Sequence, residues 1–371
     1  MKYCINLDWV ELHCEFDSLC FRSHFGTQDN TLTHDFSVRL REYGTRVYKH
    51  VSTIYYKHRE FATLCYCPLS SQDTGGIMSP LMCHIKIENS WCYDDRWFEV
   101  LMLALRVFRI KPKRISRVDM CCDVQYFECG LYAADLAQGL IRRKYYKIHQ
   151  ANWGAHGTDS SKLAWHSLSF GSKNSPVFTR FYNKTLELKQ GKDKQYIREV
   201  WQQNGINPNR DTWRIEFALT DTGREVIDTE TGEQFDIPID SLADKQWLQG
   251  LFFHYAQHYF DIRKNTGARR YDCPRLKLLP DSPKMFVPVQ RPRLGAMNTA
   301  DKMVLNRLRD LAAECPNRTE RFALLRAIKL YQYYRRVEQF DEKEMLNYQM
   351  WLYELPSDDD QPQDKQQLRF A

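Results

Sequence analysis

The chain has 371 residues, of which 43% are hydrophobic and 13% aromatic, and its formal net charge is +6. This composition excludes an intrinsically disordered chain, and the length is sufficient for two or three domains with sizeable cores. No stretch of about 18 apolar residues is present, and the N-terminus lacks a basic start followed by an apolar run, so we expect neither a membrane span nor a signal peptide.

The 12 cysteines are irregularly spaced, which does not suggest a disulfide framework in a chain of this size without a secretion signal. We expect reduced thiols and a cytoplasmic location. Cys65 and Cys67 are closer together than the ligands of a usual zinc knuckle, so a structural zinc site is not expected.

Five segments show the alternation of polar and apolar residues that is typical of half-buried strands. In the first, residues 3–16, we expect Ile5, Leu7 and Trp9 on one face and Asn6 and Asp8 on the other. Similar alternation predicts strands at 83–93, 114–127, 177–189 and 212–220, and a further segment, 164–175, leads through a Gly-Ser turn into the fourth of them.

Helical patterns lie between these strands. Residues 94–110 should form a helix capped by Asp94 or Asp95, residues 131–146 a second, and residues 193–205 a short one closed by Gly205. Residues 241–263 begin with a capping pattern at Ser241 and Asp244 and should form a long helix.

Because the predicted strands alternate instead of being apolar throughout, we predict an α+β fold with a largely antiparallel, curved sheet, one open face and flanking helices. This domain would cover residues 1–279, and a proline-rich linker would follow at 280–293. We expect a helical C-terminal region at 294–355 and a polar, disordered tail at 356–371.

The open face of the predicted sheet gathers ionisable side chains. Read as a strand, residues 177–189 place Arg180, Tyr182 and Lys184 on one face. If the other strands are neighbours, they add to this face Asp8, Glu88, Arg117, Asp119, Cys121, Asp123, Arg214 and Glu216.

Carboxylates that lie close together repel one another, and a hard divalent cation such as Mg²⁺ or Mn²⁺ relieves this repulsion. We expect Asp119 and Glu216 to hold such an ion, with Asp8, Glu88 and Asp123 as further candidates. The ion would polarise a phosphodiester, and together with nearby cations it would make the phenolate of a tyrosine easier to form. The set is therefore sufficient for attack by Tyr182 on a phosphodiester, assisted by Arg180, Lys184 and Arg214. A network of structural salt bridges is the alternative interpretation.

Basic residues cluster in three separate stretches, 106–117, 142–147 and 263–277, and aromatic residues are interleaved with them. Cations can pair with phosphates and rings can stack on bases, so the clusters indicate a nucleic-acid-binding surface. Ordinary solvated helix ends and loops are the alternative. The candidate DNA-binding residues are Arg114, Arg117, Arg142, Arg143, Lys144, Lys173, Arg269 and Arg270.

In their order and spacing, the stretches SRVDMCCD, SFGSKNS, RFYNKTLE and WRIEF resemble the trans-acting initiators of rolling-circle replication and the related relaxases of conjugative elements. The resemblance covers roughly residues 8–219 and leaves the C-terminal region unmatched. It implies an enzyme that nicks and rejoins DNA, in which Tyr182 becomes linked to a 5′ phosphate and frees a 3′ hydroxyl while acidic strand residues hold the metal. The two adjacent cysteines and Lys173 depart from the family pattern without removing a group that this chemistry needs.

Expected partners are origin DNA in single-stranded or extruded form, a second copy of the chain in a homodimer, and a host helicase, with no membrane. Two other functions stay open. A non-catalytic origin-binding protein or repressor would keep the basic clusters without needing Tyr182. A tyrosine recombinase would need an Arg-His-Arg set on helices. The sequence does not distinguish a plasmid, a conjugative element or a phage as the host element.

Two further patterns have ordinary structural explanations. The commoner type of nickase binds metal through a His-hydrophobe-His strand, and no His-x-His occurs here; His254 and His258 have helical spacing and should pack among aromatic rings. Trp153 and His156 are expected in a surface loop, where they could also stack on bases.

Overall fold

The structure is a computed structural model, and it describes residues 1–18, 30–31, 35–69, 79–148, 153–157, 165–191, 194–228, 234–281, 286–288, 299–315 and 317–334. The chain divides into two compact units, Met1–Val289 and Gln290–Ala371. Each unit is described by itself below.

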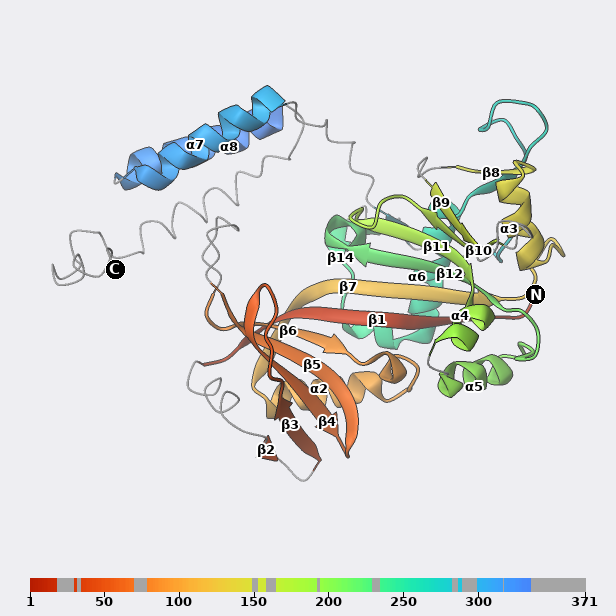
Figure 1. Cartoon of the computed structure of the whole chain (residues 1–371), viewed down its shortest axis with the longest axis horizontal. Coiled ribbons are helices and arrows are strands. Elements are labelled where there is room, and N and C mark those ends of the chain that lie inside the picture. Colours follow the sequence, from red (N-terminus) through yellow and green to blue (C-terminus); the bar gives the residue numbers. More distant parts are fainter. Residues whose placement is uncertain are drawn as a thin grey trace. The chain divides into compact units, whose positions relative to one another are not determined.

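In the described residues, the first unit is built on an eleven-stranded sheet with the strand order β2-β3-β4-β5-β6-β1-β7-β12-β11-β10-β9 (Figure 1). Every neighbouring pair is antiparallel. The strands are β1 Tyr3–Phe16, β2 Asn30–Thr31, β3 Phe36–Leu40, β4 Tyr48–Tyr56, β5 Arg59–Pro68, β6 Met82–Ile87, β7 Ile110–Val124, β9 Trp153–Gly157, β10 Trp165–Phe170, β11 Val177–Asn183 and β12 Trp213–Thr220.

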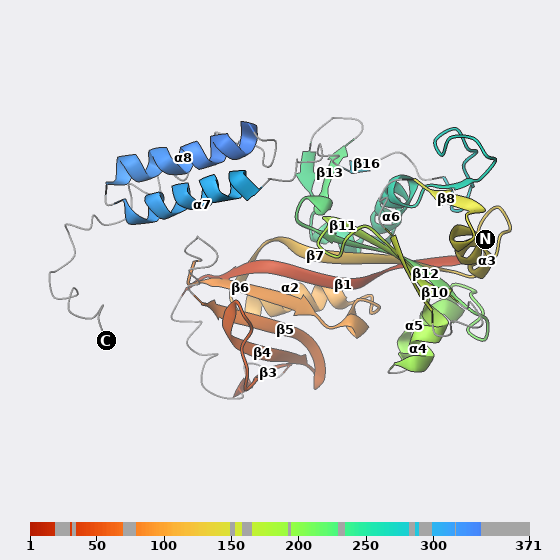
Figure 2. The ribbon, with the colours of Figure 1, turned by 45° about the horizontal axis from the view of Figure 1, so that its top comes forward.

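Helices cover the sheet on both faces at the end that holds β12 and β11 (Figure 2). The apolar face packs with α2 (Trp97–Val107), α3 (Ala133–Ile141) and α6 (Lys245–Tyr259) into one continuous core. On the polar face, α4 (Lys184–Gln190) and α5 (Gln195–Gln203) build a smaller cluster around Trp201 and Cys4. The predicted α+β class, with a largely antiparallel sheet and flanking helices, is confirmed.

The first strand has the predicted bounds, but its faces differ from the prediction. The register between β1 and β7 shifts between Leu7 and Trp9, where β1 carries Asp8 as an extra residue. A β-bulge of this kind reverses the alternation beyond it. Trp9 is therefore opposite Asp119 on the polar face, and its predicted place beside Leu7 is wrong.

The strand predicted at 177–189 is shorter than expected. It ends at Asn183, whose side chain accepts a hydrogen bond from the Leu186 N–H and caps α4. Asparagine is a strong N-cap, so the chain turns into a helix where the alternation alone suggested a continuing strand. Lys184 is thus the first residue of a helix.

The ends of three helices also differ from their predicted positions. Helix α2 has Arg96 at its N-cap, and the side chain of Asp94, one of the two predicted caps, accepts a hydrogen bond from the Arg96 N–H at 3.1 Å. The helix predicted at 131–146 ends at Ile141, because Tyr145–Lys147 form β8 and pair with β15 (Ile262–Lys264). The long helix starts at Lys245 with Asp244 as its cap, after the 3-10 turn η4 (Asp240–Ala243).

Three predicted non-helical segments also differ from their predictions. Strand β6 ends at Ile87, and the 3-10 turn η2 (Asn89–Trp91) follows it. Trp153–Gly157 is a strand, so the loop predicted there is wrong. Within the predicted proline-rich linker, Phe286–Pro288 form β16. This strand belongs to a three-stranded sheet with β13 (Glu225–Asp228) and β14 (Gln234–Asp236), and the turn η3 (Asp221–Arg224) precedes β13.

The second unit contains α7 (Thr299–Glu314) and α8 (Arg318–Tyr334), which pack against each other. The predicted helical character is confirmed for these residues, and the rest of 294–355 and the tail at 356–371 lie outside the described residues. No helix of the described chain is long and apolar enough to cross a membrane.

Candidate active site

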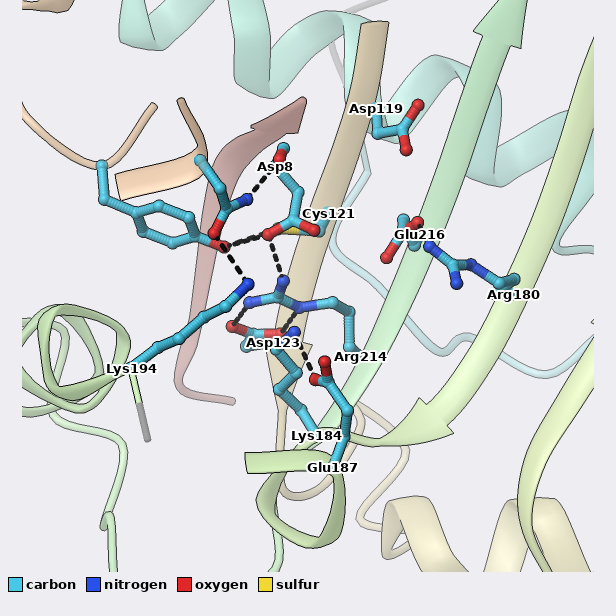
Figure 3. A network of polar contacts seen from close by, with 12 residues as sticks. Asp8, Asp119, Cys121, Asp123, Arg180, Lys184, Glu187, Lys194, Arg214 and Glu216 are labelled. Carbon is cyan, nitrogen blue, oxygen red and sulfur yellow. Dashed lines mark hydrogen bonds and ion pairs between the residues drawn. The ribbon is translucent and has the colours of Figure 1, made fainter. Parts of the chain in front are cut away.

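The register of three neighbouring strands brings the predicted site residues to one face. Strand β12 lies between β7 and β11, with Arg214 opposite both Asp123 and Tyr182. Two residues further along β12, and on the same face, Glu216 is opposite both Cys121 and Arg180. Figure 3 shows the Asp119 and Glu216 carboxylates on adjacent strands, apart from the cluster around Arg214.

The Tyr182 hydroxyl donates a hydrogen bond to Glu216 Oε2 at 2.8 Å. The other oxygen of this buried carboxylate pairs with Arg180, whose side chain is 40% exposed. The Arg180 guanidinium and the Lys184 Nζ lie 5.4 and 5.6 Å from the centre of the Tyr182 ring. A carboxylate thus holds the phenolic hydrogen, and two cations flank the ring.

The electrostatics around Tyr182 differ from the expectation. Burial raises the pKa of its hydroxyl well above the ordinary value, and the charge of Glu216 raises it further, while Arg214 and Arg180 only partly oppose this. The nearby cations thus act in the predicted direction, but burial outweighs them in this arrangement. Proton transfer to Glu216 during attack would not require a phenolate formed beforehand.

Asp119 lies beside this pair. Arg117 donates to it through Nε and Nη2 at 2.8 and 2.7 Å, and the Arg117 side chain is 35% exposed. Burial, and to a smaller extent the charge of Glu216, raises the pKa of Asp119 to about 7 even though Arg117 opposes the shift. Asp119 and Glu216 are therefore close enough for their charges to repel.

Asp8 and Asp123 belong to a different network, centred on the fully buried Arg214. Arg214 donates to Asp123 through Nε and Nη2 at 2.6 and 2.7 Å, and to Asp8 through Nη1 at 2.6 Å. Tyr93 donates to Asp8 at 2.6 Å, and the Trp201 indole donates to Asp123 at 2.7 Å. Burial alone would raise the pKa of Asp8, but the charges of Arg214 and Lys184 hold it below its ordinary value.

These contacts show how each predicted metal ligand is engaged in the structure. Asp8 and Asp123 are satisfied by Arg214, and Glu88 lies beyond the end of β6 at the start of η2. In the described part of the chain, no group of three or more His, Cys, Asp or Glu side chains is placed to hold a metal ion. Asp119 and Glu216 remain as a pair, and Mg²⁺ often takes only one or two protein carboxylates together with substrate phosphates and water.

Several members of the site were not predicted. Tyr93, in the turn after η2, and Trp201, on α5, reach the Arg214 network. Asn89 links its side chain to the Asp8 backbone and to Lys194. These contacts join residues 78 to 105 positions apart, and no local pattern in the sequence marks them.

The predicted DNA-binding residues, apart from Arg117, are exposed. The β8–β15 pairing brings two basic stretches together: the Asn265 N–H donates to the Lys144 carbonyl at 2.9 Å, and the Arg270 guanidinium lies 5.2 Å from the Tyr146 ring centre. Residues 142–147 and 263–270 thus form one basic surface, whereas Arg117 is engaged by Asp119.

The site is part of a sheet face and is not enclosed by either of two cavities found in the described residues. The larger, of about 510 Å³, is lined by the start of β1, residues 93–95, α5 and the start of α6. The smaller, of about 150 Å³, lies between α6 and residues 275–281. Neither is lined by Tyr182, Asp119 or Glu216.

Comparison with known proteins adds one finding. The chain is similar to the solved structure of a rolling circle replication initiator protein from Geobacillus stearothermophilus, with 14% identity and a TM-score of 0.41. The match covers 74% of this chain and 92% of the other. No protein family model matches the chain. No curated protein matches it either.

Proposed function

We propose that the chain is a replication initiator that nicks and rejoins one strand of DNA with Tyr182 as its nucleophile. The observation that carries the proposal is the hydrogen bond from the Tyr182 hydroxyl to Glu216 on a face that also holds Asp119, Arg117 and Arg180. A nucleophile needs a nearby base and a means of offsetting charge on the phosphate, and this face supplies both.

In the proposed reaction, Glu216 accepts the Tyr182 proton as the phenolic oxygen attacks phosphorus. A bond forms between this oxygen and the 5′ phosphate, and the bond from phosphorus to the 3′ oxygen breaks. The 3′ oxygen leaves and takes a proton from water to become a hydroxyl. Arg180 and Arg117 are partly exposed and have long side chains, so their guanidinium groups can shift from the carboxylates to phosphate oxygens. Rejoining is the reverse of these steps.

We propose that Asp119 and Glu216 hold a Mg²⁺ or Mn²⁺ ion together with the DNA phosphate, because their arginine partners, Arg117 and Arg180, are partly exposed and can move aside. Asp8 and Asp123, in contrast, pair with the fully buried Arg214. When bound, the ion supplies polarisation of the phosphodiester and offsets charge on the leaving oxygen. Arg214 is a positioning residue in this proposal, since it joins β1, β7 and β12 beneath the site.

Single-stranded or extruded origin DNA is the proposed substrate, because its backbone is accessible without the opening of intact duplex. The exposed basic surface of residues 142–147 and 263–270 would hold flanking DNA through its phosphates. The homodimer and the host helicase stay predictions.

The test is formation of a covalent adduct between the chain and labelled DNA, single-stranded or supercoiled, in the presence of Mn²⁺. Tyr182→Phe should bind DNA normally and form no adduct, whereas the matched control Tyr271→Phe, at an exposed tyrosine outside the site, should react like the wild type. An adduct formed by Tyr182→Phe at the wild-type rate would exclude Tyr182 as the nucleophile. DNA binding by the wild type without any adduct would favour the alternative, a non-catalytic origin-binding protein.

The metal proposal has its own test. Asp119→Asn should raise the Mn²⁺ concentration needed for half-maximal adduct formation, because a neutral amide is a weaker ligand for a hard cation. Full wild-type activity in the presence of a chelator would contradict any metal requirement.

A further inference from the structure

The β-bulge in β1 places an aromatic ring on the polar face of the sheet. Because Asp8 is an extra residue relative to β7, Trp9 is opposite Asp119 and does not join Leu7 on the apolar face. Bulges often redirect a side chain toward a functional site. Within the described residues, Trp9 is also not among the side chains of the main core. Packing of the core therefore does not explain why this ring is there.

Cations surround the Trp9 ring. Lys86 Nζ lies 3.7 Å from its centre and the Arg117 guanidinium 5.0 Å from it. The indole N–H donates to Glu11 Oε1 at 2.7 Å, which fixes the orientation of the ring. Lys86 has no carboxylate partner among the residues that the structure describes, and Arg117 is partly exposed.

The ring lies on the same face as the candidate active site. From β1 to β11 there are three strand spacings, about 14 Å in all, with Asp119 and Glu216 on the two strands between. A few nucleotides of an extended strand would cover this distance. Aromatic rings with neighbouring cations are the usual means by which proteins bind single-stranded DNA, because rings stack on bases and cations pair with phosphates.

We propose that Trp9, Lys86 and Arg117 form a binding site for one nucleotide of single-stranded DNA, a few nucleotides from the phosphate that Tyr182 attacks. The inference rests on the proposed function. The base stacks on the indole, and Lys86 leaves the ring and pairs with an adjoining phosphate. Arg117 stays between the ring and Asp119 and faces the phosphate that Tyr182 attacks. This site would fix which phosphate of a bound strand reaches Tyr182.

The test uses Tyr182→Phe as the background, so that binding is measured without reaction. A set of single-stranded oligonucleotides carries the fluorescent base 2-aminopurine at one position each, and stacking on an aromatic ring quenches its emission. We expect strong quenching at one position. Adding Trp9→Leu should remove this quenching and weaken binding by roughly 5- to 100-fold, the range expected for the loss of one stacked base.

Two further variants keep the test decisive. Trp9→Phe preserves a ring and should retain most of the quenching, and Trp247→Leu, a matched change on α6, should leave both signals unchanged. Unchanged affinity and quenching in Trp9→Leu would overturn the inference and leave Trp9 a structural partner of surface cations. Failure of every variant to bind single-stranded DNA would overturn it together with the proposed substrate. Position-specific quenching that depends on Trp9, in a chain whose wild type forms no adduct, would support this site while rejecting the nicking proposal.

Discussion

Tyr182 is only 9% exposed, and its hydroxyl donates a hydrogen bond to the fully buried carboxylate of Glu216. Burial makes the free phenolate costly, so reactivity at neutral pH has to come from a base in contact with the phenol. Glu216 is in that position. At the scale of single residues, the proposal therefore depends more on Glu216 than on the surrounding cations.

Glu216→Gln should reduce the rate of adduct formation by about 10²- to 10⁴-fold, the usual contribution of a general base. The amide retains the shape of the side chain but cannot accept the proton. DNA binding, measured separately with a labelled oligonucleotide in the absence of divalent cations, should change little, because Glu216 contacts the phosphate only through the proposed ion. Glu128→Gln, at a surface glutamate paired with Lys277, is the control and should keep the wild-type rate. A rate for Glu216→Gln close to that of the control would mean that another group takes the proton.

Two histidines should make stability depend on pH. Burial, and secondly a neighbouring histidine, lowers the pKa of both His13 and His254 from 6.5 to about 4. The unfolded chain binds these protons below about pH 6.5, whereas the folded chain stays neutral until about pH 4. Their stabilising contribution is therefore complete above pH 6.5 and is lost as the pH falls toward 4.

We expect the free energy of unfolding to fall by about 1–2 kcal/mol per histidine between pH 7 and pH 4.5, after allowance for partial exposure. The raised pKa of Asp119 acts in the opposite direction over this range, so the histidine effect is isolated by comparing His254→Phe with the wild type in urea titrations. The variant should lose less stability on acidification. Equal losses in the two proteins would show that His254 is not responsible.

At the scale of elements, the buried network around Arg214 holds the site together. The network joins β1 through Asp8, β7 through Asp123 and α5 through Trp201. The first residue of α4, Lys184, lies next to the Tyr182 ring. The same bulge that turns Trp9 outward leaves Asp8 within reach of Arg214. The one extra residue in β1 thus sets the position of the Trp9 ring and also the contact between Asp8 and Arg214.

Asp123→Asn should lower the free energy of unfolding by about 3–5 kcal/mol, because it leaves the buried Arg214 without its bidentate partner. Asp8 still neutralises part of this charge, so the value should lie nearer the lower limit. Urea unfolding of the variant and of Asp281→Asn, a change at an exposed aspartate, provides the measurement and its control. A loss below about 1 kcal/mol, the level of a surface ion pair, would mean that water reaches Arg214.

At the scale of the whole molecule, the first unit combines a polar sheet face with a separate basic surface made by β8, β15 and their flanking residues. The face carries groups suited to chemistry, and the basic surface carries exposed cations suited to holding a polyanion. This separation suggests that affinity and reaction can be altered independently.

Neutralising Arg269 and Arg270 together should weaken DNA binding and reduce the slope of log affinity against log salt by up to roughly two contacts. The rate of adduct formation on a saturating short single strand should be unchanged. Affinity titrations between low and moderate salt give the slope. A slope equal to that of the wild type would place the phosphate contacts elsewhere on the chain.

The sequence by itself determined the period-two segments and, where no bulge interrupts a strand, which side chains share a face within it. Residues 3–16 form a strand with the predicted bounds. In β12, Arg214 and Glu216 lie on one face and Trp213, Ile215 and Phe217 on the other, as expected, because side-chain alternation is a local property of an extended chain. The α+β class followed from the same alternation. Asn183 ends β11 and caps α4. The sequence alone does not predict this boundary, because the strand pattern continues past Asn183 and an asparagine side chain can also bond elsewhere.

Only the tertiary structure decided how the charges are paired. Arg214 and Asp8 lie 206 positions apart, and their contact depends on a bulge that the residue pattern does not reveal. Arg214 pairs with Asp8 and Asp123, which the sequence suggested only as possible metal ligands, and burial raises the pKa of Tyr182 more than the neighbouring cations lower it. Desolvation and long-range pairing depend on which strands become neighbours and what covers them, and these properties belong to the folded chain as a whole.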